Sequence, residues 1–142
     1  DFSEQSGQAL ELAMRIAPRS KYYLLHAYQG IEGQLWRAGF AKSEILRYRH
    51  QIAQQSREQM IDFIRRLGLD GKSIVRLLRH GRAPHVITGV ARRLRPDLVC
   101  VGSVGRTGLP HILLGSVAEH ALREAPGDVL VARSGTSRFQ LP

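Results

Sequence analysis

The sequence is poor in several features that would point to a particular class of protein. It contains one cysteine, so no disulfide can form within the chain. No apolar run approaches the ~20 residues that a membrane-spanning helix needs. The opening residues DFSEQS have neither the basic start nor the apolar stretch of a secretory signal. These absences lead us to expect a cytoplasmic protein with no membrane partner.

Charge is the most unbalanced property of the chain. Lys and Arg total 21 against 12 Asp and Glu, for a net charge of +9. Such a field favours anionic partners, although a solvated, arginine-rich surface is the commoner explanation. Aromatic residues make up only 6% of the chain and are not interleaved with the arginines. With no nucleic-acid module signature either, nucleic acid is not an expected partner.

Helical and strand-like patterns alternate along the 142 residues, which we expect to form one domain over 1–142. Expected helices cover 3–17, 43–67, 83–94 and 116–125, and expected strands cover 21–28, 73–79, 97–101 and 128–133. Ser3 and Ser43 are the expected caps of the first two helices, and the glycine-containing stretch 29–42 is expected to be a loop. This alternation predicts an α/β fold with an open parallel sheet covered by helices on both faces.

The start of the chain departs from that pattern. Residues 1–3 read as the turn into a helix, where a doubly wound fold would first deliver a strand. We therefore expect a sheet whose first, central strand is absent from this chain.

The stretch GSVGRTGLPHILLGS, residues 102–116, follows an expected strand and precedes an expected helix. Glycine lets main-chain N–H groups approach an anion closely, and a helix start favours negative charge. The stretch therefore predicts a phosphate-binding loop, with Arg106 as a charged clamp. It lacks the Gly-Lys-[Ser/Thr] of a Walker loop and the glycine spacing of the dinucleotide fingerprint. A plain strand-to-helix connection stays open as the alternative.

The run DLVCVGSVGRTGLPHILLGSVAEHALREAPGDVLVAR resembles the C-terminal half of a universal stress protein domain. DFSEQSGQALELA, LLHAY and HGRAPHVITGVA are similar to earlier parts of that family's domain. The resemblance implies an open five-stranded parallel sheet with strand order 3-2-1-4-5. It also implies the ATP-binding type, whose Gly-x2-Gly-x9-Gly-[Ser/Thr] motif is present here.

The resemblance assigns roles to individual residues. Those that would hold the phosphates and ribose are Gly102, Gly105, Gly115, Ser116 and the amide of Val117. Asp1 would lie against the adenosine, and Ala27 and Val101 would line the adenine pocket. In the family, final strands pair, so a homodimer through residues 128–133 is expected.

The function that these observations predict is a nucleotide-dependent regulatory or stress-response protein that binds ATP. No catalytic residue is expected, because the loop offers neither a convincing base nor a lysine for the γ-phosphate. Asp1 is the one candidate to hold a Mg²⁺ ion with the nucleotide. Two alternatives stay open: an interaction domain that acts only through dimerisation, and a slow ATP hydrolase.

Other reactive side chains have ordinary explanations in the sequence. His80 and His85 lack the carboxylates or cysteines of a metal site, and His26 reads as a core histidine. Cys100 lies within an apolar strand and is expected to be an inert thiol.

Overall fold

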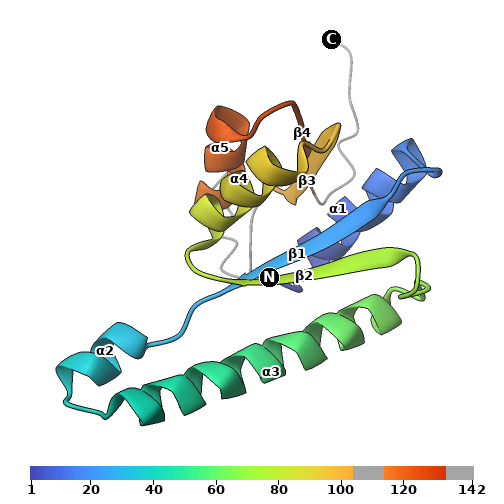
Figure 1. Cartoon of the computed structure of the whole chain (residues 1–142). Coiled ribbons are helices and arrows are strands. Elements are labelled where there is room, and N and C mark those ends of the chain that lie inside the picture. Colours follow the sequence, from blue (N-terminus) through green and yellow to red (C-terminus); the bar gives the residue numbers. More distant parts are fainter. Residues whose placement is uncertain (104–113, 134–142) are drawn as a thin grey trace.

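The computed structural model describes residues 1–103 and 114–133, and Figure 1 shows the chain. The elements are α1 (Glu4–Ile16), β1 (Tyr22–Tyr28), α2 (Glu32–Arg37), α3 (Lys42–Arg66), β2 (Ile74–His80), α4 (Ala83–Leu94), β3 (Leu98–Gly102), α5 (Ser116–Glu124) and β4 (Asp128–Ala132). Strands and helices alternate as expected, and the predicted α/β class is confirmed.

The strands form two parallel pairs. β1 pairs with β2 from Tyr22↔Ile74 to Tyr28↔His80. β3 pairs with β4 from Leu98↔Asp128 to Gly102↔Ala132. In the expected order 3-2-1-4-5, these pairs correspond to strands 3-2 and 4-5. Within residues 1–103 and 114–133 no strand joins the two pairs, which leaves open the central position that strand 1 has in the expected order.

Helices cover both sides of these sheets. In Figure 1, α3 lies along β1 and β2 on one side, while α4 and α5 pack together on the other. α1 packs against β3 and β4. The core cluster joins Met60 and Ile64 of α3 to Ile74 of β2, all at most 4% exposed. The helices cover the strands only in part, since every residue of β3 and six of the seven of β1 are half-buried, while four of the seven residues of β2 are exposed. The full burial that the apolar character of β1 and β3 predicts is therefore not reached.

The first two long helices begin differently. Ser3 caps α1 as expected, since its Oγ accepts a hydrogen bond from the N–H of Ser6 at 3.2 Å. The expected cap at Ser43 is wrong, because α3 begins one residue earlier and Ala41 is its N-cap. The Glu44 carboxylate accepts the Ala41 N–H at 2.9 Å, so a side chain inside the helix satisfies the helix start.

The expected loop over 29–42 is also wrong, because it contains the helix α2. The carbonyl of Ile31 accepts the N–H groups of Gln34 and Leu35, at 2.8 and 3.0 Å, which starts the turn. Gly39, with φ of +82°, follows the helix in the left-handed conformation that commonly ends one. The glycines therefore flank a short helix. No helix in the described part of the chain has the length and apolar character needed to cross a membrane.

Candidate functional site

The two ends of the glycine-rich stretch meet at the carboxyl ends of β3 and β4. The N–H of Ser103 donates to the carbonyl of Ala132 at 2.7 Å, and the N–H of Gly115 donates to the carbonyl of Ser103 at 2.6 Å. Ser103 itself is 3% exposed. The two ends of the stretch, Ser103 and Gly115, are thus joined at the strand edge where α/β proteins bind ligands. Gly105 and Arg106 lie outside the described residues.

The helix that follows the loop begins without a side-chain cap. Gly115 is the N-cap of α5, with φ −78° and ψ 156°, and as a glycine it has no side chain to accept a hydrogen bond from the first turn. Ser116 is exposed and Val117 is half-buried. The first N–H groups of a helix have no intrahelical partner and carry the positive end of its dipole. The start of α5 therefore presents main-chain donors that suit an anion.

Gly102 ends β3 where α1 comes closest to it. A Cβ built on Gly102 would lie 3.3 Å from the backbone carbon and oxygen of Gln5. That separation is tighter than most Cβ contacts, so the missing side chain lets the first turn of α1 pack on the strand end. Gly102 thus has a packing role of its own, and its φ is not positive.

Gly102→Ala is expected to destabilise the fold by about 1–3 kcal/mol, because α1 must shift to admit the methyl group. Gly33→Ala is the matched control, since nothing lies within 4 Å of its Cβ position in α2. This control should be neutral or stabilising by up to ~1 kcal/mol, as alanine favours helix. Urea unfolding of both variants checks the prediction, and equal stabilities would contradict it.

Asp1 lies at the start of α1, bound to that helix's first residues. Its Oδ1 accepts hydrogen bonds from Ser3 Oγ at 2.7 Å and from Ser6 Oγ at 2.6 Å. The next residue, Phe2, stacks on His26 of β1 with ring centroids 4.2 Å apart. Residues 1–5 therefore link the end of β1 to the end of β3, where Gln5 meets Gly102.

The two residues expected to line the base lie on different strand pairs. Ala27 is opposite Arg79, one residue before the end of β1. Val101 is opposite Val131, one residue before the end of β3. The structure thus brings Val101, the loop base and the start of α5 to one edge.

The family's sequence profile, described as the universal stress protein family (Usp), matches residues 1–133. The chain belongs to the universal stress protein family. A universal stress protein E homolog from Haemophilus influenzae is 42% identical over 53 residues, which make up 37% of this chain and 17% of that protein. The matched segment therefore spans less than a fifth of that relative's length.

Solved structures share the fold over nearly the whole chain. The hypothetical protein MJ0577 superposes with a TM-score of 0.77 at 22% identity, covering 96% of this chain and 93% of that one. A universal stress protein solved in complex with cAMP superposes with a TM-score of 0.59 at 25% identity, covering 95% and 92% of the two chains. The doubly wound arrangement expected from the sequence is that of these proteins.

One polar contact in this universal stress protein joins two residues that no sequence motif links. His80 Nε2, at the end of β2, lies 2.8 Å from Glu32 Oε1 of α2. The Tyr28 ring stands edge-on to His80 at 5.3 Å. The partners are 48 residues apart, and Glu32 lies in a stretch expected to be a loop, so no local pattern could have found the pair. The contact ties α2 to the carboxyl end of β2.

Glu32 is set to remain ionised at neutral pH. Burial alone would raise its pKa, but a backbone hydrogen bond, His80 and the charge of Arg49 together hold the pKa below the ordinary 4.5. Because the pKa of Glu32 is lower in the folded protein, its ionised carboxylate stabilises the fold. This contribution is complete above pH 4.5, the ordinary pKa, and is lost as the pH falls through the lowered pKa.

Acidification from about pH 6 to about pH 3 is therefore expected to loosen α2 once Glu32 is protonated. Fluorescence anisotropy of Trp36, which lies in α2, checks this as a fall below pH 4.5. Glu32→Gln should show the loosened value at neutral pH, at a cost of about 1 kcal/mol. A variant whose anisotropy follows that of the parent protein at every pH would contradict the prediction.

The remaining reactive side chains are two histidines on α4 and α5 and the thiol of Cys100 in β3. His85 and His120 stack edge-to-face at 5.4 Å between α4 and α5. Among the residues that the structure describes, no group of three or more His, Cys, Asp or Glu is placed to hold a metal ion. Burial raises the pKa of the Cys100 thiol, which keeps it protonated and unreactive near neutral pH.

Proposed function

We propose that this universal stress protein binds ATP at the loop 102–116 and acts as a nucleotide-dependent regulatory protein. The observation that carries the proposal is the closed loop base leading into the uncapped start of α5. A triphosphate placed there would accept hydrogen bonds from main-chain donors that the N-cap glycine cannot satisfy with a side chain. The chain's net charge of +9 would favour the approach of such a ligand.

The family supports a nucleotide as the ligand. A relative of the same fold, 25% identical to this chain, was solved in complex with cAMP. The motif Gly102-x2-Gly105-x9-Gly115-Ser116 is the one that the resemblance associates with ATP-binding members. We propose that the amides of Ser116 and Val117 bind the phosphates, with Gly105 and Arg106 completing the loop. Asp1, Ala27 and Val101 would contact the nucleoside.

The chain's own residues suit binding better than hydrolysis. Hydrolysis needs a base that positions water and a cation at the γ-phosphate. The Asp1 carboxylate is already held by Ser3 and Ser6. A Mg²⁺ ion would arrive on the triphosphate, since the described residues offer no ligand cluster. Regulation then requires that ATP bind two states of the protein with different affinity.

Isothermal titration of the intact chain with ATP, ADP, adenosine and cAMP tests the proposal. Binding that weakens from ATP to ADP to adenosine supports a site built around the phosphates. Equal affinity for ATP and adenosine, or no heat with any of the four, would sink it. Steady phosphate release that is lost in Ser116→Ala would instead favour a slow hydrolase.

We also propose that two copies pair through β4. Within the described residues β4 is hydrogen-bonded to β3 alone, so its other edge is open. An open edge with Val129, Leu130 and Val131 is prone to pair with another strand. Light scattering should give a dimer mass at micromolar concentration. A strict monomer there would remove this proposal and leave the nucleotide site untouched.

A further inference from the structure

Exposed apolar side chains concentrate in one segment of the chain. Nine large hydrophobic residues are exposed among those described, and four of them fall within residues 31–46. These four are Ile31 (46% exposed), Trp36 (65%), Phe40 (46%) and Leu46 (52%). We call residues 31–50, comprising α2 and the start of α3, the arm.

The arm stands apart from the core. In Figure 1, α2 and the first turns of α3 extend beyond the two sheets. No residue of α2 is buried, and every buried residue of α3 lies at Ser56 or later. A short convex element of this kind offers no enclosed surface for a small ligand. Its exposed apolar side chains would suit a partner that offers a wide apolar surface and can adapt its shape.

The arm also carries cations that lie outside the close ion pairs of the described residues. Arg37, Lys42, Arg47 and Arg49 are all exposed. None of them forms an ion pair among the salt bridges of the described residues.

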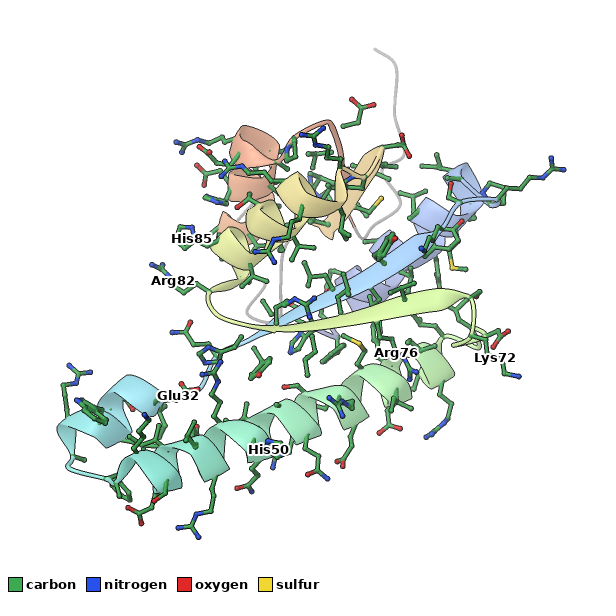
Figure 2. The ribbon with its side chains drawn as sticks, in the orientation of Figure 1. Glu32, His50, Lys72, Arg76, Arg82 and His85 are labelled. Carbon is green, nitrogen blue, oxygen red and sulfur yellow. The ribbon has the colours of Figure 1, made fainter. Side chains whose placement is uncertain are left out.

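The arm has two acidic residues against these four cations. Glu32 pairs with His80 and lies between α2 and the rest of the molecule (Figure 2), and Glu44 caps Ala41. The outward charge of the arm is therefore positive, beside its exposed apolar residues.

We propose that the arm docks on the surface of an anionic lipid bilayer. Aromatic and aliphatic side chains insert at the headgroup–acyl boundary while neighbouring Lys and Arg meet the anionic headgroups. A second arm would bring like charges together, since the exposed charge of the arm is positive, so pairing of copies is left to β4 as proposed above. This peripheral contact crosses no membrane, and it does not depend on nucleotide binding.

Trp36 is the chain's one tryptophan, so intrinsic fluorescence reports on the arm without a label. The full chain is titrated with vesicles of phosphatidylcholine containing one third phosphatidylglycerol, and with vesicles of phosphatidylcholine alone. We expect co-sedimentation, a blue shift of Trp36 emission and quenching by brominated acyl chains with the anionic vesicles only. Added salt should reverse the binding.

Paired variants locate the contact. R47Q/R49Q should weaken partitioning by about 25-fold, at about fivefold for each charge near the surface. R76Q/R79Q removes the same charge from the exposed positions of β2 and should change it by no more than about threefold. Leu46→Asp should abolish the blue shift, while Leu122→Asp, at the similarly exposed Leu122 (49%) of α5, should preserve it.

Three results would overturn the proposal. The first is no binding to anionic vesicles, which would leave an acidic protein as the better partner. The second is equal loss in both charge variants, which would mean binding through net charge alone. The third is a blue shift that grows with protein concentration in the absence of vesicles, which would indicate self-association of the arm.

Discussion

Gly115→Asp is expected to abolish ATP binding while leaving the fold intact or slightly more stable. Gly115 has the extended backbone of an N-cap, where aspartate is among the preferred residues. The new carboxylate would accept hydrogen bonds from the first N–H groups of α5 and stabilise the helix by up to about 1 kcal/mol, since glycine is itself a tolerated N-cap. It would also repel the phosphates, at a cost of several kcal/mol. We therefore expect at least about a 100-fold loss of ATP affinity, or ~2.8 kcal/mol.

Gly115→Asn distinguishes the effect of the added negative charge from the effect of the added side chain. Asparagine caps a helix as well as aspartate but carries no charge. This variant should compete for the same N–H groups and bind ATP with an affinity between the other two. Thermal unfolding of all three proteins reports the fold, and calorimetry reports the ligand. An aspartate variant that is stable and binds ATP normally would place the phosphates elsewhere.

Met60→Ala is expected to have the largest effect on stability. Met60 is 2% exposed and packs with Ile64 and Ile74 where α3 meets β2. Truncation of a buried side chain of this size removes its transfer free energy and leaves a cavity, for a loss of about 2–5 kcal/mol. The midpoint of urea unfolding measures this loss, with the slope unchanged.

Leu46→Ala is the matched control on the same helix. Leu46 is 52% exposed and lies in the arm, so its truncation should cost no more than ~0.5 kcal/mol. The two variants test whether the second half of α3 packs in the core while its first half is exposed to solvent. Equal costs at the two positions would show that the arm packs as firmly as the core.

The sequence predicts the fold well where periodicity and caps act locally. The strand 21–28 and the helix 83–94 match β1 and α4 closely, and Ser3 caps α1. The arm is the region where local rules fail. Its glycines read as a loop, whereas the Ile31 carbonyl starts a helix, and Glu44 rather than Ser43 satisfies the start of α3. A main-chain carbonyl sets the first boundary, and a side chain that reaches back to a main-chain N–H sets the second. Residue type alone does not reveal either contact.

The candidate site was predictable in part for a similar reason. The glycine spacing indicates a phosphate loop, and its base is closed by hydrogen bonds of Ser103 that no motif contains. Glycine is required at position 102 because Gln5, nearly a hundred residues away in the sequence, packs against it. The Glu32–His80 contact also joins segments that are distant in the sequence. Such long-range contacts depend on how the strands assemble, which the linear pattern leaves open.

The most direct test of the central claim is a titration of the ¹⁵N-labelled chain with ATP, followed through its backbone amide resonances. If main-chain donors at the start of α5 hold the phosphates, the amides of Gly102, Gly115, Ser116 and Val117 should shift with ATP, and far less with adenosine. Saturating ATP that moves other amides and leaves these four unchanged would contradict the account.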